Sequence, residues 1–190
     1  MPFFRVHLFA RGPDPHTLAV SMTGVQMGDR VVHVGCANGG RLGAIASKVG
    51  LSGTFVAIVP DEHAAVRARK GAANAGALVE IEIAPPTKLR SADAAFDLAI
   101  VDDTEGLVTS LDERGRASAM REALRVLRPG GRVVVLGAGE RTGLRALLSR
   151  GPAVLSFDPT SALQTEGFKS VRKLAERDAL VFTEGIKRKA

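Results

Sequence analysis

The 190-residue sequence contains one cysteine, Cys36, and neither tryptophan nor tyrosine. A single cysteine excludes an intramolecular disulfide and a cysteine-based zinc site, so we expect no metal. Aromatic residues make up only 4% of the chain, which leaves few stacking surfaces for single-stranded nucleic acid. No apolar run reaches the ~20 residues that cross a bilayer, and Arg5 and Arg11 interrupt any signal-peptide core. We therefore expect a cytoplasmic protein without a membrane partner.

Positive charge is in excess, with a formal net charge of +6. This excess favours an anionic partner such as RNA, an acyl carrier or an acidic small molecule. The Lys and Arg residues are scattered, apart from a basic tail at Lys187–Lys189, and form no single stripe. We therefore expect a small-molecule substrate rather than a nucleic acid, and a monomer or homodimer.

Hydrophobic residues make up 45% of the chain, enough for one core, so we expect a single domain over residues 1–190. Residues 1–24 would form a helical extension or lid, 25–184 the core and 185–190 the tail. Short apolar runs alternate with amphipathic helical patterns. The expected helices cover residues 16–22, 41–49, 62–75, 114–127, 139–148 and 160–164, and the expected strands 30–34, 54–59, 78–83, 96–101, 132–136, 170–174 and 180–183.

This order predicts an α/β, doubly wound, Rossmann-like sheet of seven mostly parallel strands with helices on both faces. The last two strands are separated only by Glu176–Asp178, which predicts an antiparallel C-terminal hairpin. Pro129–Gly131 would end the preceding helix before the fifth strand. The glycine-rich segment 35–40 joins the first strand to its helix, where positive φ angles and helix N–H groups could admit a nucleoside-type ligand. The alternative is that the glycines only make the connection tight.

Three segments resemble the class I S-adenosylmethionine (SAM)-dependent methyltransferases, and most closely the small, stand-alone type 11 bacterial members. They are VVHVGCANGG (31–40), FDLAIVDD (96–103) and ALRVLRPGGRVVVLG (123–137), within a likeness that covers residues 24–184. The resemblance implies SAM as cofactor and a binding set at the ends of the first three strands. That set is His33, Gly35, Cys36, Ala37, Asn38, Gly39, Val59, Pro60, Asp61, Pro85, Pro86 and Thr87.

The chain departs from the family pattern where acidic residues are usual. His33 replaces the acid before the glycine turn, Val59 the acid that binds the ribose hydroxyls, and Pro85 the acid that faces the adenine, while Ala37 stands where glycine is usual. Each lost hydrogen bond to a charged acceptor is worth roughly 1.5 to 3 kcal/mol. Asp61 or Glu62 could bind the ribose hydroxyls in place of the missing acid. The alternative is that each interacts only with the dipole of the helix that it opens.

Asp102 and Asp103 end the fourth strand and are the candidate catalytic bases, with a turn or cap as the alternative role. For His33 and Cys36 we favour structural roles. The leading hypothesis is a SAM-dependent methyltransferase acting on a small molecule. The alternative is a degenerate, methyltransferase-like binding or assembly module that binds SAM weakly or not at all. A loosened dinucleotide fingerprint at Gly35, Ala37 and Gly40 lacks its downstream acid.

Overall fold

The computed structural model describes residues 16–139 and 157–189. Its elements are α1 (Thr17–Thr23), β1 (Arg30–Val34), α2 (Gly40–Val49), β2 (Thr54–Val59), α3 (Glu62–Ala75), β3 (Glu80–Ile83), β4 (Phe96–Asp102), α4 (Glu113–Val126), β5 (Leu127–Ala138), α6 (Pro159–Thr165), β6 (Lys169–Arg177) and β7 (Leu180–Ile186). The strands form one seven-stranded sheet in the order β3-β2-β1-β4-β5-β7-β6. Strands β1 to β5 pair in parallel, and β7 pairs antiparallel with both β5 and β6. The predicted fold class is confirmed.

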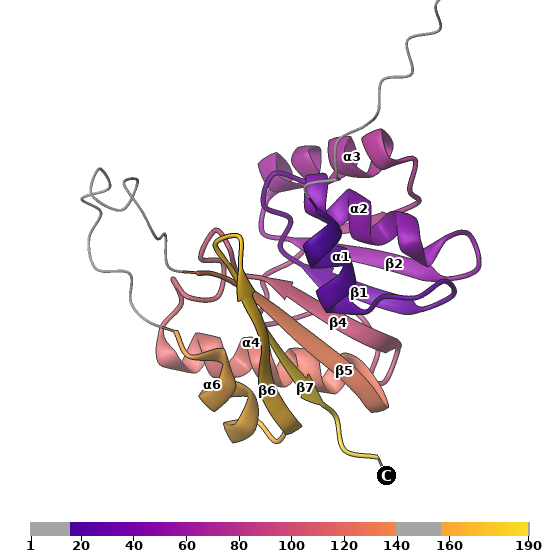
Figure 1. The fold of residues 1–190 in the computed structure, drawn as a ribbon. Helices are drawn as coiled ribbons and strands as arrows, with labels where there is room; N and C mark the ends of the chain where they lie inside the picture. The colour runs from indigo at the N-terminus through magenta and orange to yellow at the C-terminus, as the bar shows by residue number, and fades with distance from the viewer. Residues whose placement is uncertain (1–15, 140–156, 190) are drawn as a thin grey trace, which may run out of the picture.

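Side chains alternate between the two faces of the sheet and so build two cores. Val32 and Val34 of β1 pack in the core that α4 and α6 cover. Val31 packs in the core beneath α1, α2 and α3, and His33 points to the same face, where its ring contacts Phe55. Figure 1 shows α1, α2 and α3 at one end of the sheet and α4 and α6 against its other face.

Local signals explain where the helices begin and end. Asp61 caps α3, because its carboxylate accepts a hydrogen bond from the Ala64 amide at 2.8 Å. Gly76 ends the same helix in the left-handed conformation with φ of 63°, and Gly24 ends α1 in the same conformation with φ of 57°. Asp112 caps α4 in the same way through the amide of Gly115.

Several boundaries differ from the prediction, among them the end of β7, which runs to Ile186 rather than Thr183. Residues 78 and 79 precede β3 rather than open it. The segment Pro129–Gly131 was expected to separate a helix from a strand, but α4 ends at Val126 and β5 begins at Leu127, which pairs with Phe96 across a register shift. Strand β6 continues through Arg177, so the hairpin turn is Asp178-Ala179, both with positive φ as a two-residue hairpin requires. The helix predicted over 139–148 lies outside the described residues from 140 onward.

Helices α2 and α3 approach each other through glycine. A Cβ atom on Gly71 of α3 would overlap the carbonyl oxygen of Gly39, and one on Gly43 of α2 would overlap the carbonyl oxygen of Gly71. The two backbones are therefore in direct contact. This contact holds the segment after β1 against α3 and so shapes the edge of the sheet at the carboxyl ends of its parallel strands.

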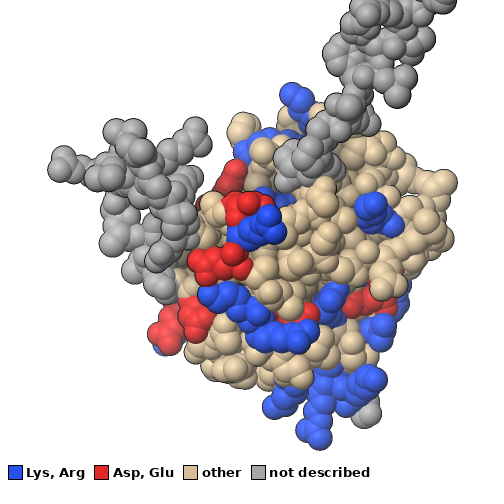
Figure 2. Space-filling model, in the orientation of Figure 1, with Lys and Arg blue, Asp and Glu red and all other residues tan. Residues whose placement is uncertain are grey.

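The cationic side chains are interspersed with anionic ones, as the scattered sequence pattern suggests. Arg172 on β6 lies 2.7 Å from Glu184 on β7, and Lys173 lies 2.7 Å from Glu176. Figure 2 shows Lys and Arg beside Asp and Glu across the middle of the face it displays. No helix in the described part of the chain is long and apolar enough to cross a bilayer.

Candidate functional site

The strand order reverses between β1 and β4, and a cavity lies at the carboxyl ends of the strands there. In doubly wound sheets this reversal is where ligands bind. The cavity has a volume of about 140 Å³. Its walls come from the glycine turn, the end of β2, the first turns of α3 and the segment after β4: Gly35, Cys36, Ala37, Pro60, Ala64, Arg67, Asp102, Glu105 and Leu107.

The turn after β1 needs its glycines for packing. Gly35 has φ +89°, and a Cβ atom there would lie 2.5 Å from the carbonyl oxygen of Asp102. Gly39 has φ +84°, and its Cβ would overlap the carbonyl oxygen of Arg67. Ala37 adopts φ +44°, a conformation that costs a side chain energy and that glycine adopts freely. The turn is thus pressed between the end of β4 and the side of α3.

Arg67 lies over the mouth of the cavity. Its Nε donates to the Ala37 carbonyl at 2.7 Å, its Nη1 lies 2.7 Å from Nδ1 of His63, and its Nη2 donates to Glu105 at 3.3 Å. The Arg67 and Glu105 side chains are 33% and 58% exposed. Exposed pairs of this kind contribute only about 0.2–1 kcal/mol, so a ligand can displace this one at low cost.

Asp102 is buried beneath the turn and fully engaged. Arg41 of α2 binds it bidentately, with Nε 3.0 Å from Oδ2 and Nη2 2.9 Å from Oδ1. The Thr104 hydroxyl donates to Oδ1 at 2.6 Å. The Asp102 side chain is 0% exposed, whereas that of Arg41 is 12% exposed. This geometry suits a group that positions the turn and the end of β4.

Asp103 shapes the segment that follows β4. Its Oδ1 accepts hydrogen bonds from the amides of Val108 and Thr109 at 2.6 and 3.1 Å, and its Oδ2 accepts one from the Thr109 hydroxyl at 2.5 Å. It therefore has the capping geometry that was the alternative to catalysis. The catalytic roles of Asp102 and Asp103 stay predictions.

His33 and Cys36 lie beneath the turn as neutral groups. Burial lowers the pKa of His33, whose Nδ1 lies 2.8 Å from the Gly35 carbonyl and must carry the proton to donate to it. Its Nε2 is buried without a hydrogen-bond partner among the described residues. Burial raises the pKa of the Cys36 thiol, which donates to the Ala64 carbonyl at 3.3 Å. Neither has the surroundings of a nucleophile or a charged base.

The site residues predicted at the ends of the second and third strands do not come together in the structure. Val59 is 0% exposed and packs in the core beneath α1 to α3, so its side chain does not reach the cavity. Asp61 caps α3, and Glu62 pairs with Arg69 at 2.6 Å. The segment 85–87 follows β3 and lines no part of the cavity. Asn38 borders a different groove, on the outer side of α2 and α3.

The sequence reasoning missed Ala64, Arg67, Glu105 and Leu107, which line the cavity, and Arg41, which binds Asp102. A usable signal existed for two of them. Pro60, Ala64 and Arg67 follow a spacing of four and three, which places them on one face of the helix that starts after β2. Nothing in the sequence indicated that Glu105 would meet that face.

Comparison with known proteins identifies the family. A family model described as "Methyltransferase domain" matches residues 31–131, which span the glycine turn, β4 and the start of β5. The chain belongs to the class I SAM-dependent methyltransferases. A relative in Streptomyces fradiae, an uncharacterized 37.1 kDa protein in transposon TN4556, is 34% identical over 108 residues, or 57% of this chain. The match spans only 30% of that relative.

Solved structures share the fold of this methyltransferase-family chain. A SAM-dependent methyltransferase from Aquifex aeolicus has a TM-score of 0.74 at 18% identity, covering 90% of this chain and 89% of that one. One from Methanosarcina mazei has a TM-score of 0.65 at 19% identity, covering 94% and 100%. The [4+2]-cyclase SpnF also matches, with a TM-score of 0.65 at 17% identity, covering 92% and 80%. At these identities the likeness shows the fold alone.

SAM is the cofactor of the family, and the residues present fit it at the turn but not at the end of β2. The glycine turn, the carboxyl end of β4 and the reversal of strand order form the edge of the sheet at which the cofactor is expected. The cavity is smaller than the ~300–1,000 Å³ of ordinary ligand sites, and Arg67 and Glu105, which pair with each other, are among the residues that line it. Glu105 is exposed and Arg67 is partly exposed, whereas Val59, where the family has an acceptor, is an apolar and fully buried side chain.

Proposed function

We propose that this protein binds SAM in the cavity at the ends of β1, β2 and β4 and transfers its methyl group to a small-molecule acceptor. The observation that carries the proposal is the position of that cavity, at the strand reversal and against the glycine turn of a methyltransferase-family fold. The side chains of His33, Val59 and Pro85, where the chain departs from the family pattern, do not fill it. His33 and Val59 lie in the core below, and Pro85 lies elsewhere.

The bound cofactor would supply a methyl group on a sulfonium, which an acceptor atom attacks in line. The backbone of residues 35–39 would hold its amino-acid end, and Pro60 and Ala64 would border its ribose. Positioning of this kind and exclusion of water provide much of the rate in such a displacement. Asp102, held by Arg41, would fix the wall against which the acceptor lies.

A general base is needed only if the atom that receives the methyl group carries a proton. Asp102 and Asp103 are the candidates from sequence, and both already accept several hydrogen bonds. Glu105 is the lining carboxylate that solvent reaches, with 58% of its side chain exposed. We therefore add Glu105 to the candidates, since displacement of Arg67 would free its carboxylate beside the ligand.

Calorimetric titration with SAM and with S-adenosylhomocysteine tests this proposal. We expect both to bind, and Arg67→Ala to tighten binding by up to about fivefold, because the ligand no longer has to break the exposed pair. Arg69→Ala is the matched control, since Arg69 lies on the same helix and pairs with Glu62 away from the cavity. No binding at low millimolar concentration to the wild type and to Arg67→Ala would refute the proposal.

A second candidate is a binding or assembly module without catalysis. Two observations favour it: Val59 offers no acceptor to the ribose hydroxyls, and the cavity is small and covered. The two candidates differ in turnover. Transfer of a labelled methyl group from SAM to any component of a small-molecule extract would exclude the module, and loss of that transfer in Gly35→Val would tie it to this cavity.

A further inference from the structure

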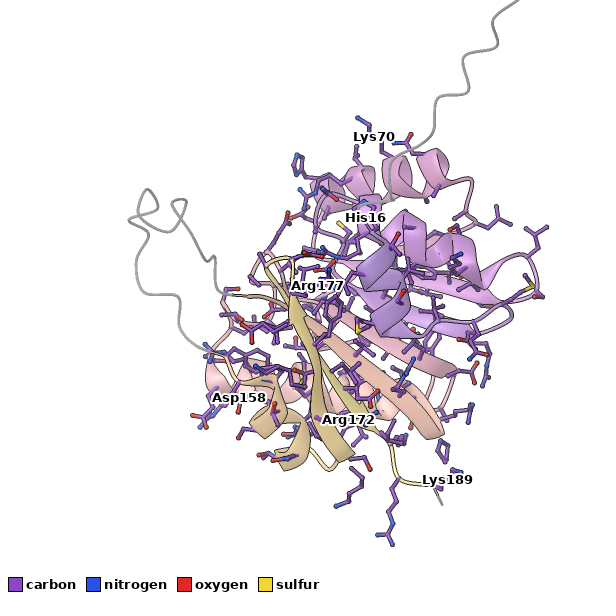
Figure 3. The ribbon with its side chains drawn as sticks, in the orientation of Figure 1. His16, Lys70, Asp158, Arg172, Arg177 and Lys189 are labelled. Carbon is purple, nitrogen blue, oxygen red and sulfur yellow. The ribbon has the colours of Figure 1, made fainter. Side chains whose placement is uncertain are left out.

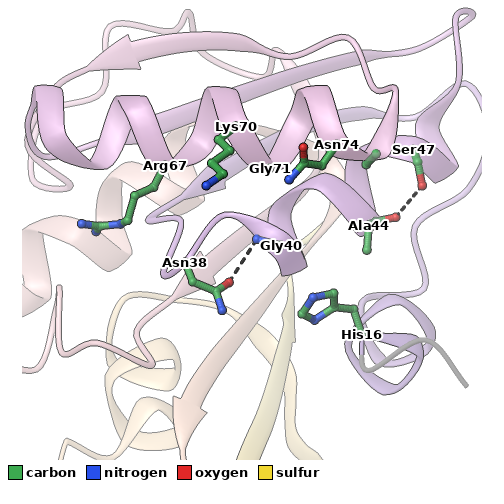
Figure 4. A pocket seen from close by; sticks show the side chains of 10 residues that line it. His16, Asn38, Gly40, Ala44, Ser47, Arg67, Lys70, Gly71 and Asn74 are labelled. Carbon is green, nitrogen blue, oxygen red and sulfur yellow. Dashed lines mark hydrogen bonds between the residues drawn. The ribbon is translucent and has the colours of Figure 1, made fainter. Parts of the chain in front are cut away.

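A second, larger hollow lies outside the cofactor cavity, over the contact between α2 and α3. Its volume is about 770 Å³. Figure 4 shows the side chains that line it: His16, Asn38, Gly40, Ala44, Ser47, Arg67, Lys70, Gly71, Asn74 and Ala75. Arg67 is the one residue that this groove shares with the cavity. Figure 3 places Lys70 and His16 at the end of the molecule that holds α1 to α3, far from Asp158 beside α6.

The groove follows from how the two helices pack. Their backbones touch at Gly43 and Gly71, and residues beside the contact, such as Ala44 and Ala75, have small side chains. The floor is therefore low and largely free of side-chain atoms. Long polar side chains rise from α3 at a spacing of three and four, namely Arg67, Lys70 and Asn74, and form one wall.

Among the described residues, the lining carries positive charge and no negative charge. Lys70 is exposed, and its ammonium forms no ion pair with a carboxylate in residues 16–139 and 157–189. Asn38 and Asn74 add amide groups on opposite sides of the groove, and Figure 4 shows Lys70 projecting toward the turn that contains Asn38. Asn38 Oδ1 accepts the Gly40 amide at 3.0 Å, which leaves its NH₂ group as a donor to a ligand.

We propose that this groove binds the phosphate group of a small phosphorylated ligand. Phosphate offers several strong acceptor oxygens and negative charge, which match the Lys70 ammonium and the amide groups of Asn38 and Asn74. An apolar ligand would leave these polar groups without hydrogen-bond partners, and none of the described lining residues is a carboxylate that would repel an anion. The site is distinct from the proposed SAM cavity, because Lys70 and Asn74 line the groove and not the cavity, although Arg67 lines both.

Calorimetry with three probes, inorganic phosphate, pyrophosphate and adenosine diphosphate, tests the proposal and separates free phosphate from a nucleotide. We expect at least one to bind the wild type, with affinity that falls as salt concentration rises. Lys70→Glu should weaken binding about ten- to a hundredfold, and Lys70→Arg should restore most of it. The matched control is Lys48→Glu, which makes the same charge change on an exposed lysine of α2 outside the groove.

Two results would overturn the proposal. One is no binding of any of the three probes at low millimolar concentration. The other is equal weakening by Lys70→Glu and Lys48→Glu, which would mean that net charge, not this groove, attracts the anion. Titration of the same variants with SAM keeps the two proposals separate, since Lys70→Glu should leave SAM binding unchanged within twofold whether or not phosphate binds.

Discussion

Arg41 at the start of α2 and Asp102 at the end of β4, 61 residues apart in sequence, form a bidentate ion pair beneath the glycine turn. The pair ties the helix that follows β1 to the strand beside β1. It therefore fixes the side of the candidate site on which an acceptor would lie.

Removal of one partner of this pair should be strongly destabilising. Arg41→Met leaves the Asp102 carboxylate, 0% exposed, with only the Thr104 groups as donors. We expect a loss of about 3 kcal/mol in the free energy of unfolding, measured by urea denaturation. Arg41→Met combined with Asp102→Asn should recover at least half of that loss, because no buried charge remains. A single variant within about 0.5 kcal/mol of wild type would contradict the reasoning.

The two residues at the end of β2 should respond oppositely to an introduced acid. Val59→Asp buries a carboxylate in the core beneath α2 and α3 and should cost about 3 to 5 kcal/mol without improving SAM binding. Pro60→Asp places its carboxylate at the exposed cavity wall and should tighten SAM binding about tenfold by accepting ribose hydroxyls. Urea denaturation and calorimetry measure the two effects. Unchanged SAM affinity in Pro60→Asp would argue against a ribose at this wall.

Contact between helix backbones makes Gly71 intolerant of a methyl group. Alanine is normally better than glycine inside a helix by about 1 kcal/mol. At Gly71, however, the added Cβ overlaps the Gly39 carbonyl oxygen, a backbone atom that cannot rotate away. We expect Gly71→Ala to destabilise the protein by about 2 kcal/mol. Gly137→Ala, where a Cβ meets no atom within 4 Å, should stay near wild type; equal unfolding midpoints for both variants would count against the close contact.

His33 should make stability depend on mildly acidic pH. Burial lowers its pKa in the folded protein, so below the unfolded value of about 6.5 the unfolded chain binds a proton that the folded chain does not. Stability is therefore full above about pH 7 and declines as the pH falls through the unfolded value of about 6.5. His33→Leu should flatten the dependence of the urea midpoint on pH over this window. An unchanged slope in His33→Leu would be inconsistent with a neutral buried ring.

Much of the fold follows from local patterns. Alternation of apolar strands with capped helices, and the short connection near Asp178, predicted the parallel sheet, its two helical layers and the C-terminal hairpin. These features depend on neighbours in sequence, through caps, glycine stops and hydrophobic periodicity. Boundaries were less accurate at Leu127, because pairing with Phe96 on another strand extends β5 through a proline and two glycines.

The sequence alone determined the sheet, the glycine turn at its ligand edge and the absence of an acid at Val59. Only the tertiary structure decided that Arg41 binds Asp102, that Arg67 and Glu105 pair at the cavity wall, and that Lys70 borders a groove with no carboxylate among its described lining residues. The physical reason is that the two ion pairs join residues that lie 61 and 38 positions apart in the sequence. Such contacts arise from how strands and helices are stacked, and no local propensity encodes them.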